Sequence, residues 1–560
     1  MLVKFSGSNY KAFESFDLDL KPLTILLGAN SCGKSAILNS FLMLAQSIDS
    51  ASRTETPFRL NGSRVGMGES LNIVKDKNPN NTLSFTFELD DQTSIKALVD
   101  TAKKECIEVH LAYSRFIFQS FRRERLLNDK AYSILNELED FYYGNDSFNN
   151  KQLKKISSKI CSLIRFYRAN KDIINSKTKI STSKAIQNFV ENVSYQRIND
   201  CLVGLLTIPL SKLAAQKIDF TFSYSRKKDC LKISTANMYN KVGERIISLK
   251  VDRSSEVTIT SDIIDNDLLK RSKKDLAYFI DLTSLISFNN EISIRASPIT
   301  YFSETINPVA IYLSKVLSAS MKELKSSFNG VNINHVSPLR AFPQRYYLLD
   351  KAIYHNQLNA LDGTELAEVL KNNENIKDSI NELLAEFNLA VEVERVNDVI
   401  HKITVNQNAV NLELTDVGFG ISQVLPILVQ AHLSPPHSIT IIEQPEIHLH
   451  PKMQAWLTDA LIKIALSSSK KFIIETHSDA LVRRIRLRIV DDESPLSEND
   501  LSMYYLERDK LNNRTSMRKI PVSPDGDITW PSEFMDVEII DTLEIQQKKL
   551  ERMLKEHGVQ

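Results

Sequence analysis

The sequence predicts an α/β fold built from the two ends of the chain, with a long mainly helical insertion between them. Strand-length apolar runs occur in the first ninety residues and return after about residue 331, where several are followed by a loop and a helical pattern. Alternation of strands and helices is typical of a parallel sheet. We therefore expect three segments along the chain, at residues 1–95, 96–330 and 331–560.

The composition is that of a folded globular protein. The 560 residues are 42% hydrophobic and 25% charged, with 70 Lys and Arg against 69 Asp and Glu, which excludes a disordered or fibrous chain. Apolar runs such as 23–27 are far shorter than the roughly 18 residues that a membrane span needs. Residues 1–20 also lack the basic and apolar regions of a secretory signal. We therefore expect a cytoplasmic protein without a membrane partner.

The cysteines are scattered and lack a Cys-x-x-Cys pair. Their odd number argues against a disulfide framework, and their spacing argues against a zinc site. A reducing compartment is the simplest interpretation. The five are Cys32, Cys106, Cys161, Cys201 and Cys230.

The apolar periodicity places the elements in order. In the first segment we expect strands at 2–5, 16–20, 23–27 and 83–89 and a helix at about 34–48. In the insertion we expect helices at 131–141 and 153–167, strands at 218–223 and 257–259, and helices up to about 328. In the last segment we expect strands of the parallel sheet at 400–405, 439–442 and 471–475, and a C-terminal helix at about 537–556.

A phosphate-binding motif follows the strand at 23–27. The stretch from Gly28 to Ser35 fits G-x-x-x-x-G-K-[ST] and opens a helix, which is the context that the motif requires. Backbone N–H groups of the loop, from Gly28 through Asn30 to Gly33, would hold the phosphates of ATP. Lys34 would neutralise the terminal phosphates, and Ser35 would bind Mg²⁺. The alternative is a glycine-rich turn without a ligand.

A second apolar strand, at 439–442, ends in acids and has the form of a Walker B strand. Glu443 would hold Mg²⁺, directly or through water. The next position usually carries the carboxylate that activates water, but here it is Gln444, an amide that cannot accept a proton. Either Gln444 orients the water, or Glu446 serves as the base. The alternative for Glu446 is an acid that only favours a helix start.

Two further elements complete the pattern. His477 follows the strand at 471–475, where an ABC-type ATPase places a histidine that contacts the γ-phosphate; alternatively it is a structural histidine. Upstream of Walker B, a loop with Gly418, Gly420 and Ser422 opens an apolar helix and resembles a degenerate ABC signature loop. In that class the loop closes on ATP held by the opposite subunit. The alternative is a plain helix start capped by Ser422.

With these four elements in order, the chain resembles an ABC-type, SMC-like ATPase of the group that includes the overcoming-lysogenization-defect ATPases. Residues 9–13, Asn-Tyr-Lys-Ala-Phe, resemble the N-F-K-S-F motif of that class near the adenine. The resemblance implies an ABC-type P-loop ATPase head formed by the N- and C-terminal parts, with ATP and Mg²⁺ as cofactors. It also implies a homodimer or higher oligomer in which ATP lies between two subunits.

Within this class the chain is most similar to the Septu-type ATPases of antiphage defence, including retron-associated versions. Three stretches carry the resemblance: 337–340 with 344–347, 443–446 with His448 and His450, and 525–531. Gln444 is typical of that subgroup. The resemblance implies a sensor and regulator of a separate HNH nuclease, with a reverse transcriptase and its RNA-linked DNA in retron versions. The sequence itself shows neither the acidic cluster of a Toprim nuclease nor an HNH-like arrangement.

The insertion carries a basic segment that we consider for nucleic-acid binding. Residues 151–184 contain ten Lys or Arg and one acid. Phe166 and Tyr167 lie among these cations, so that phosphate contacts and base stacking would be combined. The alternative is a solvated helix face, and a second basic run at 483–488 fits a partner interface equally well. The nucleic-acid candidates are Lys154, Lys155, Arg165 and Arg168.

The sequence thus predicts an ATPase that hydrolyses ATP slowly because Gln444 replaces the usual carboxylate. The first functional hypothesis is regulation of an HNH nuclease in a Septu- or retron-type system. The alternative is an SMC-like DNA repair or recombination ATPase without a nuclease partner, which would need a long arm. A transporter's nucleotide-binding subunit is disfavoured by the degenerate signature loop.

Overall fold

The computed structural model describes most of the chain. The described residues are 1–50, 56–90, 93–123, 125–144, 148–172, 194–252, 256–282, 285, 287–288, 307–340, 342–348, 358, 365–407, 410–509, 514–529, 544–550 and 552–553. The chain forms two compact units, each made of separate stretches. The first comprises Met1–Lys11 and Phe41–Asn329, and the second comprises Ala12–Ser40 and Gly330–Gln560.

An antiparallel sheet forms one part of the first unit. Its strand order is β1-β4-β5-β6-β7-β8. Alternate residues of β4 are buried, so Phe85 and Phe87 join Phe5, Phe41 and Phe328 in one aromatic cluster. The strands are β1 (Leu2–Tyr10), β4 (Leu83–Leu89), β5 (Lys217–Ser225), β6 (Cys230–Tyr239), β7 (Arg245–Val251) and β8 (Val257–Thr260). The expected strands at 2–5, 83–89, 218–223 and 257–259 are confirmed, whereas β6 and β7 were not predicted.

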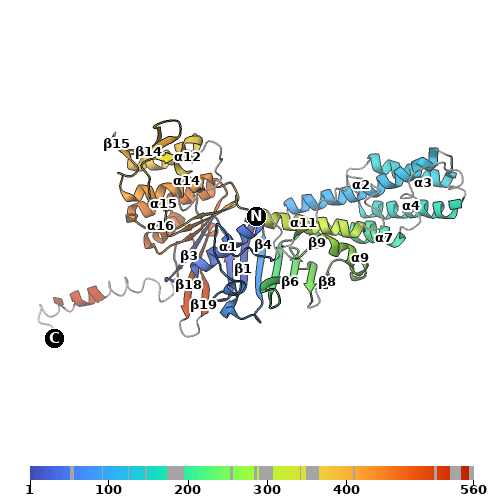
Figure 1. Ribbon diagram of the computed structural model, residues 1–560, viewed down its shortest axis with the longest axis horizontal. Coiled ribbons are helices and arrows are strands. Elements are labelled where there is room, and N and C mark those ends of the chain that lie inside the picture. The colour runs from blue at the N-terminus through green and yellow to red at the C-terminus, as the bar shows by residue number, and fades with distance from the viewer. Residues whose placement is uncertain are drawn as a thin grey trace. The chain divides into compact units, whose positions relative to one another are not determined.

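Helices make up the other part of the first unit. The long helices α2, α3 and α4 run side by side, and α11 packs against α2 (Figure 1). The expected helices at 131–141 and 153–167 are confirmed as α3 and α4. The elements are α2 (Thr93–Arg123), α3 (Asp129–Gly144), α4 (Asn150–Ala169), α7 (Tyr195–Asn199), the π-helix η3 (Asp200–Leu205), α8 (Leu210–Leu213), α9 (Asn266–Phe279), α11 (Pro308–Phe328), the 3₁₀ turns η1 (Ser70–Ile73) and η2 (Lys75–Lys77), and the short strands β9 (Ile280–Asp281) and β10 (Ser287–Phe288).

The second unit is built on a mainly parallel sheet. Its strand order is β11-β16-β17-β3-β18-β19-β2. The first five strands are parallel, and every residue of β3 and β17 is buried, so these two strands lie in the centre of the core. The strands are β11 (Ile333–Val336), β16 (Ile439–Glu443), β17 (Lys471–Glu475), β3 (Leu23–Gly28), β18 (Leu501–Asp509), β19 (Arg514–Ile520) and β2 (Phe13–Asp19).

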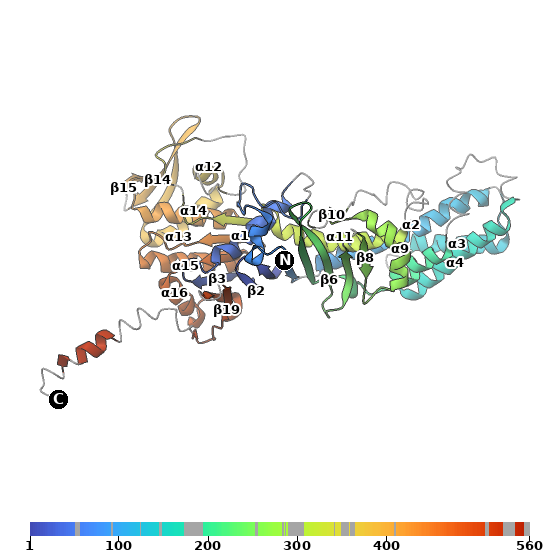
Figure 2. The same cartoon turned by 60° about the horizontal axis from the view of Figure 1, so that its bottom comes forward.

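Helices pack on this sheet. Figures 1 and 2 show α14, α15 and α16 beside one another, in agreement with their contacts. The expected helix at 34–48 is confirmed as α1. Of α1 (Lys34–Ile48), residues 34–40 belong to this unit. The other helices are α12 (Glu365–Asn372), α13 (Glu374–Leu384), α14 (Phe419–Leu433), α15 (Pro451–Ser467) and α16 (Asp479–Val490), with 3₁₀ turns η4 (Ala385–Phe387) and η5 (Glu498–Asp500).

One expected strand belongs to a different sheet. The run at 400–405 was assigned to the parallel sheet, but β14 (Ile400–Gln407) pairs antiparallel with β13 (Leu389–Arg395), β12 (Tyr347–Leu348) and β15 (Val410–Glu413). The reason is local. The Asn397 side chain accepts hydrogen bonds from the N–H groups of Val399 and Ile400, which closes a tight turn between β13 and β14.

The C-terminal region is helical where it is described, at 544–550 and 552–553. The rest of the helix expected at 537–556 lies outside the described residues, as do Trp530 and Pro531. Among the described helices, none is long and apolar enough to cross a membrane.

Candidate nucleotide-binding site

The phosphate loop connects β3 to α1 at the carboxyl edge of the parallel sheet. Gly28 and Gly33 adopt left-handed backbone with φ of 139° and 100°, and Ser31 lies between them at 63°. A Cβ on Gly28 would lie 2.3 Å from the Leu506 carbonyl oxygen, and one on Gly33 would lie 2.8 Å from the Phe13 ring. Both positions therefore need glycine for space as well as for conformation. A loop of this shape at the start of a helix is a typical phosphate-binding site, because the N–H groups of a first helical turn lack intrahelical partners.

Lys34 is the first residue of α1 and is only 3% exposed. Its Nζ donates to the carbonyl oxygens of Gly28 and Ala29, both at 2.9 Å. The same ammonium lies 3.7 Å from Glu475 Oε1. The loop therefore curls around this cation, while Asn30 and Ser35 lie exposed on it.

Glu475, the last residue of β17, is a site residue that the sequence analysis missed. It is 4% exposed, and its Oε2 accepts a hydrogen bond from Ser35 Oγ at 3.4 Å. Burial raises its pKa, and the neighbouring Glu443 adds to the rise, although Lys34 opposes it. The sequence could have indicated this residue, because Glu475 directly follows an apolar strand, as Glu443 does.

Glu443 ends β16 and lies directly beside Glu475 in the parallel register. Its carboxylate accepts a hydrogen bond from His335 Nε2 at 2.7 Å. His335 comes from β11, the neighbouring strand at the sheet edge. Among the described contacts, Ser35 therefore forms its hydrogen bond to a carboxylate with Glu475. Glu443 is hydrogen-bonded to His335 instead. The magnesium role of Glu443 and Ser35 stays a prediction.

Gln444 and Glu446, which follow Walker B, are held to the end of β17 and the residues after it by hydrogen bonds. Gln444 has a left-handed φ of 44°, and its N–H donates to the Glu475 carbonyl oxygen at 2.7 Å. Glu446 accepts from Thr476 Oγ1 at 2.8 Å through one oxygen and from the His477 N–H at 2.7 Å through the other. The structure therefore brings Gln444, Glu446 and His477 together.

His477 remains exposed at the surface of this group. Partial desolvation of the imidazole, together with the nearby Lys34 ammonium, lowers the pKa of His477, whereas Glu446 opposes the shift. The ring is therefore biased toward its neutral form, in which one nitrogen donates and the other accepts.

Arg340 is a second residue that the site analysis missed, although it lies in a stretch that carried the family resemblance. It is 7% exposed and donates from Nη2 to the carbonyl oxygens of Glu443 and Gln444, at 3.1 and 3.0 Å. Within the described part of the chain its Nε and Nη1 have no hydrogen-bond partner. Burial lowers its pKa to about 10, and Glu446 opposes the shift. Arg340 thus fixes the Walker B backbone.

The signature-like loop begins α14. Gly418 is the N-cap residue, so the alternative that Ser422 caps this helix is wrong. Gly418 is exposed, whereas Ser422 is only 3% exposed. A Cβ on Gly420 would lie 3.4 Å from Met453 Sδ, an ordinary contact distance at its lower limit. The predicted contact of this loop with ATP on a second subunit stays a prediction.

The nucleic-acid candidates lie on α4 in the first unit. Lys154 is exposed, and Lys155 forms an ion pair with Glu137 at 2.9 Å. Arg165 and Arg168 lie over the ring of Tyr195, at 5.3 and 4.8 Å from its centroid. Their role in binding nucleic acid stays a prediction.

One part of that hypothesis is wrong. Tyr167 cannot stack a base in this structure, because it is 1% exposed and stacks on Phe121. In the second basic run, Arg484 and Arg488 both bind Asp459, and Arg486 donates to the Gly526 carbonyl oxygen. Their charges are therefore used within the unit.

Comparison with known proteins decides the family. Residues 1–482 match the family model of the AAA ATPase domain. The chain belongs to the AAA ATPase domain family. ATP is therefore its nucleotide, and the predicted α/β P-loop ATPase fold is confirmed. A search of curated proteins gives no match.

Solved structures similar to this AAA ATPase include SMC head domains. An SMC head bound to the C-winged helix domain of ScpA has a TM-score of 0.36 at 9% identity, covering 93% of this chain and 98% of that chain. An SMC head domain from Thermotoga maritima has a TM-score of 0.31 at 8% identity, covering 93% and 99%. An Smc head domain with an extended coiled coil, bound to the C-terminal domain of ScpA derived from Pyrococcus furiosus, has a TM-score of 0.29 at 9% identity, covering 99% of both chains.

Lys34→Ala should abolish measurable ATP binding by this AAA ATPase. Removing one partner of a buried, hydrogen-bonded charge costs about 2–5 kcal/mol, so affinity should fall by at least about 30-fold. Isothermal titration of ATP into both proteins measures this. Lys241→Ala, an exposed lysine of the first unit, is the control and should bind as the wild type does. Unchanged affinity in Lys34→Ala would disprove the phosphate-loop assignment.

The buried Glu475 should make stability depend on pH. Because its pKa is raised, the folded chain holds this proton more tightly than the unfolded chain. The carboxyl therefore stabilises the fold at low pH, and this contribution is lost as the pH rises through the raised pKa. Glu475→Gln removes this titrating group. The free energy of unfolding of the variant, relative to that of the wild type, should therefore increase as the pH rises above about 4.3, the ordinary pKa of glutamate.

Denaturant unfolding of wild type and Glu475→Gln across this pH range measures the difference. The control is Glu386→Gln, which removes an exposed carboxyl. A stability difference between wild type and Glu475→Gln that does not change with pH would contradict the burial argument.

Proposed function

We propose that this AAA ATPase is a nucleotide-controlled regulator that binds ATP with Mg²⁺, hydrolyses it slowly and acts on a partner in its ATP-bound form. The observation that carries the proposal is Gln444. It follows the Walker B acid Glu443 and is held beside Glu475 by its backbone N–H. An amide at this point cannot take the proton of an attacking water.

The residues at the carboxyl edge of the sheet fit ATP and Mg²⁺. The left-handed glycines shape the loop between β3 and α1, and Lys34 is positioned beside the loop. The Ser35 hydroxyl and two adjacent carboxylates, Glu443 and Glu475, offer the oxygen ligands that Mg²⁺ prefers. When bound, the ion neutralises phosphate charge. Because two carboxylates lie side by side, this edge should attract a divalent cation more strongly than a monovalent one.

Glu446, the alternative base predicted from the sequence, is poorly placed for that role. Both oxygens of Glu446 already accept hydrogen bonds, from Thr476 and from the His477 backbone. For Glu446 to take a proton from water, one of these hydrogen bonds would have to be given up. Gln444 can orient water by donating and accepting hydrogen bonds, as in some GTPases. We therefore infer a long-lived ATP state rather than rapid turnover.

In this proposal the ATP-bound form is a homodimer or higher oligomer. The exposed Gly418 turn at the start of α14 would meet the nucleotide of the second subunit. The buried Ser422 would act there only after the first turn of α14 changes its position. ATP would then control assembly by binding more tightly to the oligomer than to the single subunit, which shifts the population toward the oligomer.

We propose further that the regulated partner is an HNH nuclease in a Septu- or retron-type defence system. The support is the sequence resemblance, in which the Arg340 stretch and the Glu443–Glu446 stretch lie together in the site described here. In retron-type systems the assembly would also include the reverse transcriptase and its RNA-linked DNA. Slow hydrolysis suits a sensor, because the active and inactive states must each persist.

Turnover by the purified chain should stay below about 10 per second, the median for ordinary enzymes. Gln444→Glu supplies a carboxylate and should raise turnover at least about tenfold, since general-base catalysis contributes about 10²–10⁴. A coupled ATPase assay measures both proteins. The exposed Gln407→Glu is the matched control and should leave the rate unchanged. Fast turnover by the wild type would disprove the proposal.

Affinity purification from the native host, with the genomic neighbours present, tests the partner. We expect an HNH nuclease to co-purify, with or without RNA-linked DNA. The Lys34→Ala variant serves as the second bait and should recover less nuclease if ATP controls the assembly. Recovery of this chain without a nuclease would contradict the nuclease proposal and favour a free-standing DNA repair or recombination ATPase.

A further inference from the structure

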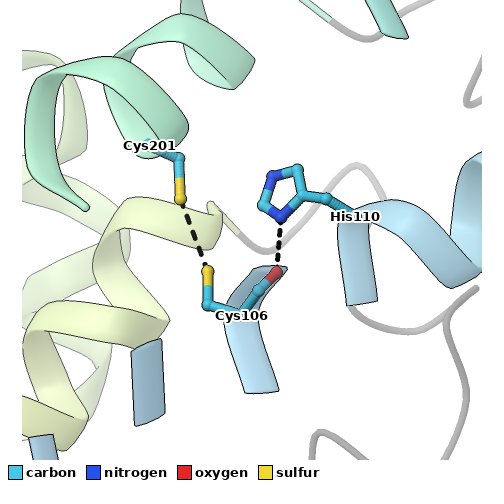
Figure 3. Close-up of side chains that lie close together, drawn as sticks. All are labelled: Cys106, His110 and Cys201. Atoms are coloured by element: carbon cyan, nitrogen blue, oxygen red, sulfur yellow. Dashed lines mark hydrogen bonds between the residues drawn. The ribbon is translucent and has the colours of Figure 1, made fainter. Parts of the chain in front are cut away.

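A buried cluster of metal-ligating side chains lies in the first unit and plays no part in the nucleotide site. Cys106, His110 and Cys201 are 1%, 1% and 0% exposed. One potential ligand atom from each lies within 4.8 Å of those from the other two. Figure 3 shows the three side chains close together, from two elements of the chain.

The local structure explains how these residues meet. Cys106 and His110 are four residues apart on α2 and therefore lie on one face of that helix. Cys201 lies 95 residues beyond Cys106, on the π-helix η3. The Leu206 N–H donates to the Cys201 carbonyl oxygen, five residues back, which is the π-helical bond. Single π-helical turns are rare and occur frequently at functional sites.

The spacing of the two sulfur atoms fits a bound cation. Cys106 Sγ and Cys201 Sγ are 3.5 Å apart. Two thiolates on a tetrahedral zinc ion, each at about 2.3 Å, are separated by about 3.8 Å. A disulfide would hold the sulfurs at about 2.05 Å. The observed separation is therefore close to the zinc value and far from that of a covalent bond.

The orientation of His110 also fits. Its Nδ1 lies 2.7 Å from the Cys106 carbonyl oxygen. A carbonyl oxygen only accepts, so Nδ1 carries the proton and Nε2 carries the lone pair that can bind a metal. Metal-ligating histidines typically donate their other N–H to a backbone carbonyl or a carboxylate, which fixes the tautomer and the ring.

A third element contributes a polar group beside the cluster. Tyr312 on α11 is 1% exposed, and within the described residues its hydroxyl has no hydrogen-bond partner. α11 packs against both α2 and η3, the two elements that carry the cluster. A buried hydroxyl without a partner is costly unless something else satisfies it.

We propose that Cys106, His110 and Cys201 supply three of the four ligands of one zinc ion, which joins α2 to η3 and stabilises the first unit. Two thiolates and a divalent ion are electrically neutral together, so the complex can be buried without an unpaired charge. The sequence argument against zinc considered only Cys-x-x-Cys pairs. Here the ligands are a Cys-x₃-His on a helix and a cysteine that only the fold brings near.

Zinc content of the untagged full-length protein, measured by inductively coupled plasma mass spectrometry, tests this proposal. We expect about one zinc per chain, and less than about a tenth of that in Cys106→Ser and Cys201→Ser, because each removes a ligand. Cys161→Ser and Cys230→Ser are matched controls at the other buried cysteines of the first unit and should keep their zinc.

Replacement of zinc by Co²⁺ gives a second measurement that does not rely on the variants folding. Wild-type protein should show thiolate-to-cobalt charge transfer and the strong visible bands of a tetrahedral ion. Absence of both signals, with no zinc retained after exposure to Zn²⁺, would overturn the proposal. A Cys106–Cys201 disulfide found by mass spectrometry in protein that takes up no zinc would replace it with a redox site. Equal zinc in wild type and in a folded Cys201→Ser would also overturn it.

Discussion

Parallel pairing of three strands is the constraint on which the nucleotide site depends. β3 pairs with β17, and β17 pairs with β16, all in the same direction. Their carboxyl ends therefore meet at one edge, which brings Gly28, Glu443 and Glu475 together although they are far apart in sequence. Because every residue of β3 and β17 is buried, a shift of this register would expose apolar side chains to water and lower the free energy of unfolding.

Opposite charges at this edge balance one another. Two carboxylates lie side by side in the register, and each has a different partner: Glu475 has Lys34 and Ser35, while Glu443 has His335. The buried Arg340 holds the backbone immediately after Glu443. In the proposed function, this arrangement would hold Mg²⁺ but would give little freedom to the groups that have to move a proton. Tight binding and slow chemistry are therefore expected from the same contacts.

Local pattern was sufficient to predict much of the fold and the phosphate loop. A buried strand, a glycine loop and an amphipathic helix are contiguous in sequence, so residues 23–48 predicted β3, the loop and α1. The run at 400–405 was misassigned because an apolar strand looks alike in either sheet, and the Asn397 turn decides its pairing. Glu475 and Arg340 were missed because their roles depend on which strands are neighbours. The Cys106, His110 and Cys201 cluster depends on contacts across 95 residues, which no local pattern contains.

The fate of bound ATP shows whether the site keeps the nucleotide intact for long periods. Radiolabelled ATP would be bound with Mg²⁺, chased with excess unlabelled nucleotide, and the label remaining on the protein would be separated into ATP and ADP over time. We expect the protein-bound label to remain mainly ATP for longer than about 0.1 s, the turnover time of an ordinary enzyme. Complete conversion to ADP within that time would show that this site does not hold ATP intact.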